Sequence, residues 1–321
     1  MRVAGSLAPG VFLCACSGPQ SALDPAGREA SEVATLFWGM LAGAALIWLA
    51  VIGAAVFAGR VQKEPIGDRA GLRLILWAGA VIPTLVLAAL LAYGLRLMPV
   101  LRAGEASLRV HVSGEQYWWR VTYERADGTR IESANELRLP AGRPAEIVLD
   151  SADVIHSFWI PALAGKLDMI PGRTNRLVLH PERIGTYRGV CAEFCGRSHA
   201  YMAFPVVVLP PQEFEAWLAR EAAPAEVPAT STTDTGAFLA NGCGGCHAVR
   251  GTAASGTIGP DLTHLASRLT LGAGMFANTS ENRRRFVAEA ETLKPGVRMP
   301  SFGALAPAEL DAIAAYLGSL R

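Results

Sequence analysis

Two groups of cysteine, histidine and methionine residues have the types and the spacing of metal and cofactor sites. The chain has 321 residues and six cysteines, which lie in three close pairs. The second pair opens the stretch C-A-E-F-C-G-R-S-H-A-Y-M at Cys191, and His156 lies upstream of it. The third pair lies in C-G-G-C-H, at Cys243 and Cys246. A disulfide framework spreads cysteines through a small chain, so these pairs favour metal and cofactor chemistry.

The group around Cys191 contains the ligand types that copper favours, namely two thiolates, two imidazoles and a thioether. A mononuclear blue-copper site uses one cysteine, whereas two close thiolates can bridge two copper ions. A Cys191–Cys195 disulfide in an exported protein is the alternative, but it explains neither the histidines nor the methionine. The pattern predicts a dinuclear copper centre that transfers electrons. Its candidate ligands are Cys191, Cys195, His156, His199 and Met202.

The C-G-G-C-H sequence is typical of the attachment site of a c-type haem. Cys243 and Cys246 would add to the haem vinyl groups, and His247 would ligate the iron. A methionine downstream is the expected ligand on the other side of the iron. Met299 is the preferred candidate because Pro300 would stiffen its loop. The competing residues are Met275 and, more weakly, His264.

The N-terminal third predicts a membrane anchor. Residues 33–58 and 74–95 are apolar and long enough to cross a bilayer. The loop between them has four basic and two acidic residues, which places it in the cytoplasm and both chain ends outside. Residues 1–16 have the character of a secretory signal and resemble a bacterial lipoprotein signal, with Cys16 as the lipidated residue.

The rest of the chain predicts two soluble domains. Residues 106–220 contain short β-rich runs separated by turn residues, which suggests an antiparallel sandwich or barrel closed by a short helix. Residues 221–236 have the composition of a linker, and residues 237–321 form a small α-helical domain. The formal charge of +1 gives no indication of nucleic-acid binding, and 51% hydrophobic residues agree with a membrane part.

The pattern C-x3-C-x3-H-x2-M, with D-V-x-H upstream, resembles subunit II of cytochrome c oxidases. The resemblance runs from Val33 to about Arg220 and includes the segment 165–173. It implies a cupredoxin-like domain in which the two cysteines bridge two copper ions, the two histidines are terminal ligands and Met202 is axial. It also implies that the backbone carbonyl of Glu193 is the remaining copper ligand. The Glu193 carboxylate would reach Mg²⁺ at the contact with the catalytic subunit.

The C-terminal domain resembles class I cytochromes c, through Met299-Pro300 and the loop Gly259–Leu262, whose carbonyls would hold the His247 ring. The whole chain is therefore similar to subunit II with a fused cytochrome c domain, as in caa3-type haem-copper oxidases. This resemblance implies a cytochrome c oxidase that is proton-translocating and reduces O2 to water in another subunit. Subunits I and III would be membrane partners, and cytochrome c or another periplasmic donor would supply electrons. Both soluble domains would lie on the outer face of a bacterial cell membrane.

Two departures from the family affect this interpretation. The run Gln116-Tyr117-Trp118-Trp119 matches the family segment where electrons arrive from soluble cytochrome c, but the family usually has tryptophan in place of Tyr117. Trp118 and Trp119 are equally suited to be core and edge residues of a strand. Many relatives also carry a glutamate linked to proton uptake at the start of the second span, where this chain has Arg73 and Leu74.

Three other classes of protein share part of this pattern. Quinol oxidases have a similar subunit, but it lacks the cysteine and histidine ligands. Nitrous-oxide reductase shares the two-copper motif but requires a large histidine-rich domain, which this chain does not contain. The remaining alternative is a membrane-anchored copper and haem electron-transfer protein that serves a different reductase.

Overall fold

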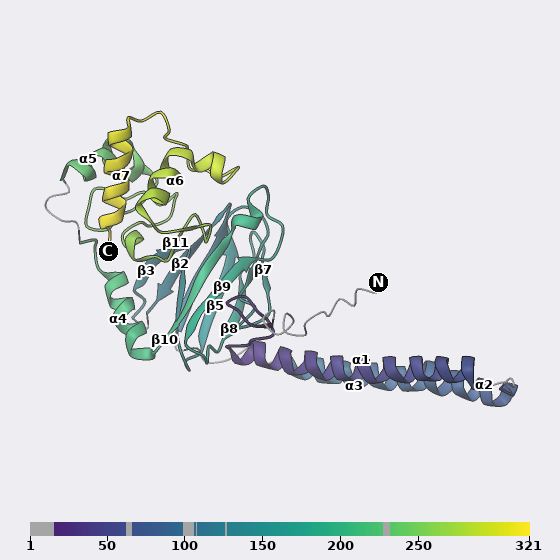
Figure 1. The fold of residues 1–321 in the computed structure, drawn as a ribbon. Helices are drawn as coiled ribbons and strands as arrows, with labels where there is room; N and C mark the ends of the chain where they lie inside the picture. The colour runs from purple at the N-terminus through teal and green to yellow at the C-terminus, as the bar shows by residue number, and fades with distance from the viewer. Residues whose placement is uncertain (1–15, 62–65, 99–105, 107, 126, 227–231) are drawn as a thin grey trace, which may run out of the picture. The chain divides into compact units, whose positions relative to one another are not determined.

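A computed structural model describes residues 16–61, 66–98, 106, 108–125, 127–226 and 232–321 (Figure 1). The chain divides into two compact units, residues 31–103 and residues 1–30 with 104–321. The expected signal sequence, apart from Cys16, lies outside the described residues. Cys16 itself is exposed.

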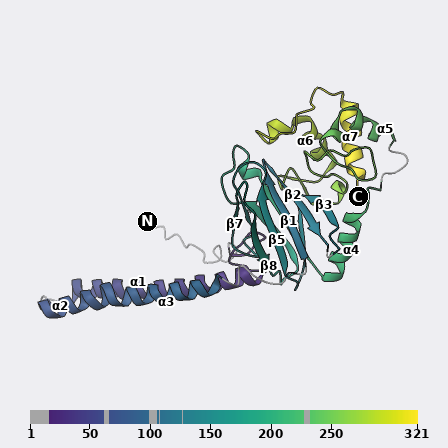
Figure 2. The same cartoon turned by 180° about the vertical axis from the view of Figure 1, so that it is seen from behind.

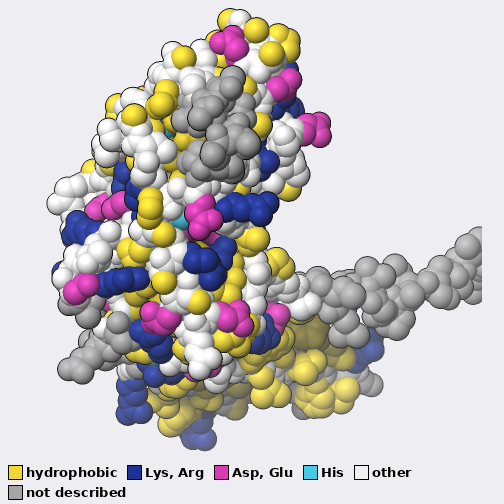
Figure 3. Space-filling model, turned by 90° about the vertical axis from the view of Figure 1, so that its left-hand side faces the viewer, with side chains coloured by type: hydrophobic (Ala, Val, Ile, Leu, Met, Phe, Trp, Pro, Cys, Tyr) yellow, Lys and Arg dark blue, Asp and Glu magenta, His cyan; other side chains and the backbone are white. Residues whose placement is uncertain are grey.

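Two long helical stretches make up the unit of residues 31–103. Helix α1 spans Arg28–Arg60, and the second stretch runs through α2 (Asp68–Leu74), the π-helical η3 (Ile75–Val81) and α3 (Ile82–Leu97). Each stretch has an apolar 18-residue window of mean hydropathy 2.4, and no residue of that window is buried by the rest of the protein. Figure 3 shows this apolar surface in yellow, against the mixed charges of the soluble part. Helices that expose apolar side chains on all sides need lipid around them.

The copper-domain segment folds into two five-stranded sheets that face each other. One sheet has the order β3-β2-β1-β5-β8 and the other has the order β4-β10-β9-β6-β7 (Figures 1 and 2). The strands are β1 (Leu108–Glu115), β2 (Trp118–Glu124), β3 (Arg130–Ala134), β4 (Leu137–Pro140), β5 (Ala145–Ser151), β6 (His156–Trp159), β7 (Leu167–Met169), β8 (Asn175–Leu179), β9 (Gly185–Cys191) and β10 (Ala203–Leu209).

Two pairings depart from the expected antiparallel sandwich or barrel. Strand β1 pairs with β5 in parallel, and β4 pairs with β10 in parallel. In both cases the partners are not consecutive, because the chain crosses between sheets before it returns to pair in the same direction. On either side of Asp127-Gly128, a typical hairpin turn sequence, β2 and β3 pair antiparallel with Glu124 opposite Arg130.

Aromatic side chains fill the space between the sheets. Trp119 contacts Phe204 edge to face with ring centroids 5.0 Å apart, and Phe204 stacks on Phe158 at 5.2 Å. A side chain at Gly189 would collide with the Phe204 ring, so the backbone of β9 lies directly against this core. Helix α4 (Pro211–Ala222) closes one end of the sandwich with buried aromatic residues. The core supports the ends of β6, β9 and β10, where the copper ligands are expected.

The cytochrome domain is small and helical, as expected. Its helices are α5 (Thr232–Ala240), α6 (Ser280–Leu293) and α7 (Pro307–Ser319), with 3-10 turns η6 (Cys243–Gly245) and η7 (Leu265–Ser267) and a short pair β11 (Thr270–Leu271) and β12 (Phe276–Ala277). Thr279 caps α6 by accepting a hydrogen bond from the backbone of Asn282. Phe238 and Tyr316 pack at the centre, with ring centroids 5.1 Å apart. The predicted fold class is thus confirmed: two apolar helices, a cupredoxin-like sandwich and a helical cytochrome c domain.

The cytochrome domain is packed on the copper domain, whereas the sequence indicated only a tether. The amide of Ala203 donates to the carbonyl of Ala273 at 2.9 Å, and Ala273 is buried with the sandwich core. Leu269 donates its amide to the Glu136 carboxylate at 2.8 Å. Arg250 also binds the carbonyl of Glu221, at the end of α4, at 2.6 Å. These contacts explain why both domains belong to one compact unit.

Candidate copper and haem sites

Sheet pairing gathers the candidate copper ligands at one end of the sandwich. Strand β6 pairs antiparallel with β9, with Phe158 opposite Cys191, so His156 lies beside the end of β9. The loop from β9 to β10 then contains the other ligands, because these two strands are also antiparallel neighbours. Its members are Cys195, His199 in the 3-10 turn η4 (His199–Tyr201), and Met202 just before β10.

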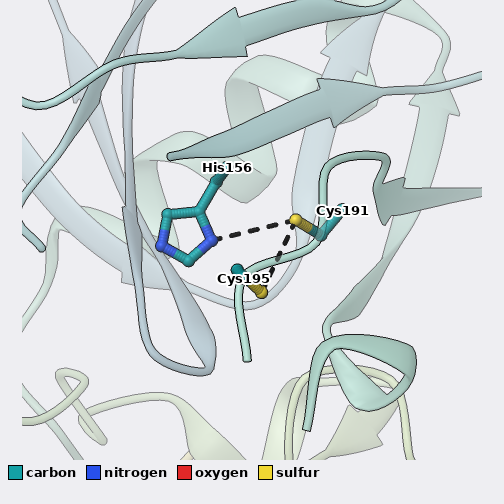
Figure 4. A group of neighbouring side chains, drawn as sticks. All are labelled: His156, Cys191 and Cys195. Atoms are coloured by element: carbon teal, nitrogen blue, oxygen red, sulfur yellow. Dashed lines mark hydrogen bonds between the residues drawn. The ribbon is translucent and has the colours of Figure 1, made fainter. Parts of the chain in front are cut away.

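Two thiols form the centre of this group, with one imidazole on each side. The sulfur atoms of Cys191 and Cys195 are 3.9 Å apart, and both cysteines are free. His156 Nδ1 is 3.8 Å from Cys191 Sγ, and His199 Nδ1 is 3.5 Å from Cys195 Sγ. The ligand atoms of His156, Cys191 and Cys195 all lie within 4.8 Å of one another (Figure 4). This arrangement fits a pair of bridging thiolates with terminal histidines.

Two weaker ligand atoms complete the arrangement. Met202 Sδ is 3.9 Å from Cys195 Sγ, and the carbonyl oxygen of Glu193 is 3.2 Å from Cys191 Sγ. Each thiol therefore has one histidine and one weak donor at its side. Soft sulfur and imidazole ligands in this number are suited to copper. These donor atoms fit the dinuclear copper centre that the sequence pattern predicts.

The His156 ring is fixed from two directions. It is completely buried, and its Nε2 is 2.8 Å from a carboxylate oxygen of Asp153, so Nδ1 faces the thiols. Asp153 is itself held by the backbone amide of Gln116 at 2.7 Å. Behind the ring, a side chain at Gly114 would come within 2.8 Å of the imidazole. Asp153 was given no role from the sequence, although it opens the D-V-x-H motif, which could have indicated it.

The electrostatics of the two thiols favour the replacement of a thiol proton by a metal ion. The hydrogen bond from Cys195, reinforced by His156, lowers the pKa of Cys191 despite burial. The same pairing and burial raise the pKa of Cys195, because two adjacent thiolates repel each other. A cation between the sulfur atoms would remove this repulsion. Metal binding would therefore release the second proton.

The Glu193 carboxylate points away from the thiols. It lies 3.6 Å from Lys166, which also pairs with Asp168 at 3.0 Å. Ser157 donates to the same Asp168 carboxylate at 2.8 Å. All three charged side chains are about half-exposed, at 44–46%. The backbone of Glu193 thus faces the copper ligands, while its side chain faces the surface.

The candidate haem residues line one cavity of about 430 Å³. Cys243, Cys246, His247 and Met299 all contribute to its wall, and most of the other lining residues are apolar. Its size is in the range of small-molecule and cofactor sites. Among the described residues, the competing candidates Met275 and His264 are not part of the wall. His264 instead lies 3.0 Å from the carbonyl of Ala223.

His247 is oriented as an iron ligand would be. Its Nδ1 donates to the carbonyl of Pro260 at 2.8 Å, as predicted for the loop Gly259–Leu262, and this leaves Nε2 free to ligate. A side chain at Gly259 would come within 2.6 Å of the ring. Burial lowers the pKa of His247, which favours the neutral imidazole that binds metals. The residues present therefore fit a covalently attached haem.

The aromatic run has three different environments. Trp119 is part of the sandwich core, as one interpretation of the sequence had it. Trp118 is half-buried, lines the haem cavity and lies under the guanidinium of Arg120 at 4.7 Å. Tyr117 is buried and lines the same cavity. A side chain at Gly196 in the copper loop would collide with the Tyr117 hydroxyl, so this ring contacts the copper loop as well.

The fold and the two ligand sets define a membrane-anchored electron-transfer protein with a cupredoxin-like domain and a cytochrome c domain. The family described as "Cytochrome C oxidase subunit II, periplasmic domain" matches residues 120–209, and the family "Cytochrome c" matches residues 235–321. Cytochrome c oxidase subunit 2 of Alkalihalophilus pseudofirmus is 32% identical over 333 residues, which covers 97% of this chain and 94% of the relative. The chain belongs to the cytochrome c oxidase subunit 2 family, in the form with a fused cytochrome c domain.

Two further likenesses are more partial. Cytochrome c oxidase subunit 2 of Bacillus sp. (strain PS3) is 33% identical over 66% of this chain and 62% of the relative. The crystal structure of the periplasmic domain of subunit II from Bradyrhizobium japonicum is 29% identical, with a TM-score of 0.35, over 37% of this chain and 99% of that one. Membership of the family implies that the chain binds copper and haem c and works in an oxidase complex with partner subunits.

Proposed function

We propose that this chain relays electrons from an external donor to its haem c, then to its dinuclear copper centre, and from there to the catalytic subunit. That subunit would reduce O2 to water and translocate protons. The observation that carries the proposal is that both ligand sets lie in one compact unit, with Tyr117 in contact with both the haem cavity and the copper loop. The aromatic position where the family receives electrons is therefore covered by the chain's own cytochrome domain.

At the copper site, each residue would have a separate role. Two copper ions would be held by the thiolates of Cys191 and Cys195, the imidazoles of His156 and His199, the thioether of Met202 and the backbone carbonyl of Glu193. When bound, the two coppers would accept and release one electron that both share. Asp153 and Gly114 would keep the His156 ring in place. Ligands held this firmly move little when the copper centre gains or loses an electron, and this small rearrangement favours fast electron transfer.

At the haem site, Cys243 and Cys246 would hold the haem covalently, and His247 and Met299 would bind its iron. When bound, the haem would carry one electron at a time. Pro260 would keep His247 in the orientation needed for ligation. The apolar cavity wall would exclude water from the iron and so raise the reduction potential. Tyr117 and Trp118 would lie between the two centres as the path for electrons, while Trp119 would support them as core.

The copper loop offers a surface for the electron's exit. Phe194 is 75% exposed between the proposed ligands Glu193 and Cys195, and an apolar side chain of this size is suited to a protein contact. Subunit I would bind here, with subunit III as a further membrane partner. The exposed Glu193 carboxylate would share a Mg²⁺ with subunit I at this contact. Cys16 would be lipidated, and both soluble domains would face the periplasm, where cytochrome c or another donor reaches the haem.

The first test is the cofactor content of the detergent-solubilised full-length chain. We expect about two copper ions and one haem per chain, with an EPR signal from one electron shared by two coppers. A single copper with a blue-site spectrum would contradict the dinuclear centre. In the assembled oxidase, Cys243→Ser/Cys246→Ser should retain copper but oxidise the donor far more slowly. Unchanged donor oxidation would contradict the relay, and co-purification with a different reductase would favour the other function.

A further inference from the structure

Lys294 is a buried lysine that connects the cytochrome domain to the copper loop. It follows the end of α6, and only 2% of its surface is exposed. Its ammonium donates to the carbonyl of Tyr201 at 2.9 Å and to the carbonyl of Gly272 at 2.6 Å. Tyr201 directly precedes the proposed copper ligand Met202, whereas Gly272 belongs to the turn between β11 and β12 of the cytochrome domain. One side chain thus binds the backbone of both domains.

This burial is costly and therefore informative. Lysine is among the residues least often buried, because removing an ammonium from water is expensive unless it is well paired. Within the described part of the chain, no carboxylate forms an ion pair with Lys294. Burial lowers its pKa to about 7, and the electrostatic effect of nearby Cys195 acts in the opposite direction. Among the residues that the structure describes, its hydrogen-bond acceptors are two carbonyls, one from each domain, so the packing of the two domains satisfies this group.

Neighbouring contacts join the same two domains. Ser198 Oγ donates to the carbonyl of Pro295 at 2.8 Å, and the Arg298 guanidinium lies 3.7 Å from the Asp153 carboxylate. The amide of Ala203 binds the carbonyl of Ala273. The cytochrome segments 272–273 and 294–295 therefore bind the copper loop between residues 198 and 203. Lys294 and Met299 also line the haem cavity, so the contact between the domains is continuous with the cavity wall.

We propose that Lys294 is a positioning residue that locks the cytochrome domain onto the copper loop and sets the rate of internal electron transfer. The inference rests on the proposed relay from haem to copper. Contacts between domains of one chain are mobile by default, and a buried charge with defined partners selects one arrangement. Transfer between two fixed centres falls steeply with their separation, so a slight loosening of this contact has a large effect on rate.

The test uses the assembled oxidase with Lys294→Met and Lys294→Gln, and Arg284→Met as the control. Methionine fills similar space but binds neither carbonyl, whereas glutamine can bind one. Arg284 is a partly exposed residue of α6 that pairs with Asp311 of α7 at 2.6 Å rather than with the copper loop. Haem c is reduced by a flash-activated reductant, and electron arrival at copper is followed by absorbance. Haem and copper content, the copper EPR signal and the haem potential are measured alongside.

We expect internal transfer to slow at least tenfold in Lys294→Met and less in Lys294→Gln, with wild-type rate in the control. Haem-to-copper transfer should also become dependent on solvent viscosity, because the loosened domains must move before the electron transfers. A defect in either redox site would not produce this dependence. Equal rates in wild type and Lys294→Met would overturn the inference. If Lys294→Met does not retain its cofactors, a wild-type rate in Lys294→Gln overturns it instead. If the wild type itself shows no transfer from haem to copper, the relay fails, which is a different result.

Discussion

Gly114 of β1 lies directly behind the imidazole of His156, on the side opposite the thiols. The backbone approaches the ring so closely that an added methyl group would be 2.8 Å from Cδ2 and 2.9 Å from Cγ. His156 is fully buried and has its Nε2 engaged by Asp153, so the ring has no room to retreat. A residue that binds no metal thus determines the position of a proposed ligand.

Gly114→Ala should therefore weaken copper binding, because the methyl group pushes His156 toward the thiols and away from Asp153. We expect a loss of copper affinity of about 10-fold or more, as is common when groups that orient a ligand are disturbed. Competition with a copper chelator measures the affinity. Gly165→Ala is the matched control, since a methyl group there meets no atom within 4 Å. Equal affinity in both variants would show that His156 tolerates the displacement.

The choice between Met299 and Met275 can be decided by paired substitutions. Met299 lines the haem cavity and Met275 does not. Met299→Ala should keep the haem covalently bound but open one iron coordination position, so that reduced haem c binds carbon monoxide. It should also lower the haem potential, because methionine ligation raises it. Met275→Ala should change neither property, and the opposite result would assign the ligand to Met275. Optical spectra and a redox titration measure both.

Glu146 connects three strands of one sheet. It lies on β5 and accepts hydrogen bonds from Arg109 of β1 at 2.6 Å and from Arg176 of β8 at 3.1 Å. Burial alone would raise the pKa of Glu146, but the two arginines outweigh it and lower that pKa below the ordinary value of 4.5. The ionised form of Glu146 is therefore more stable in the folded protein than in the unfolded chain. The sheet edge depends on this cluster only while Glu146 is ionised.

The lowered pKa gives a pH dependence of defined sign. A carboxyl group with a depressed folded pKa contributes stability above its unfolded pKa, and that contribution is lost as pH falls through the folded value. We expect Glu146→Gln to lower stability by about 0.5–1 kcal/mol at neutral pH, since the pairs are partly exposed. The difference from wild type should shrink as pH falls below the ordinary glutamate pKa of 4.5 and vanish once pH is below the lowered folded pKa.

Thermal unfolding of the detergent-solubilised chain, followed by near-ultraviolet circular dichroism, measures this difference. Glu182→Gln is the control, because Glu182 is exposed and close to the same sheet. A difference between Glu146→Gln and wild type that stays constant down to low pH would contradict an ionic contribution.

At the scale of the whole soluble unit, the cytochrome domain lies against the copper loop and the end of α4. The contacts extend from Lys294 at the copper loop to Arg250 at the end of α4. These contacts keep the proposed haem site and the proposed copper site next to each other. Internal transfer should not require an encounter, whereas the reaction of haem c with an external donor should.

The two steps should respond differently to salt. Buried contacts are screened little by ions, while encounters between charged proteins weaken steeply with ionic strength. Raising the salt from about 0.01 to 0.5 M should change the rate of haem-to-copper transfer less than about twofold. The rate of haem reduction by a charged donor should change much more. Flash reduction measures the first rate and stopped-flow mixing the second. A comparable salt dependence of both would indicate that the cytochrome domain dissociates between transfers.

Local spacing determined much of this protein. Cys191, Cys195, His199 and Met202 lie within one short loop, and Cys243 to His247 within one turn, so their grouping needs no knowledge of the fold. The two membrane helices follow from continuous apolar runs for the same reason. These features depend on residues near one another in the chain, where spacing and side-chain type restrict what can form.

Tertiary structure decided which distant residues join those local groups. His156 lies 35 residues before Cys191 and reaches it only because β6 pairs with β9. Lys294 lies 93 residues after Tyr201 and meets it only because the two domains are packed together. The parallel pairing of β1 with β5 had no local signal either. Such contacts depend on strand register and on the packing of whole surfaces, which sum many weak interactions over the entire chain.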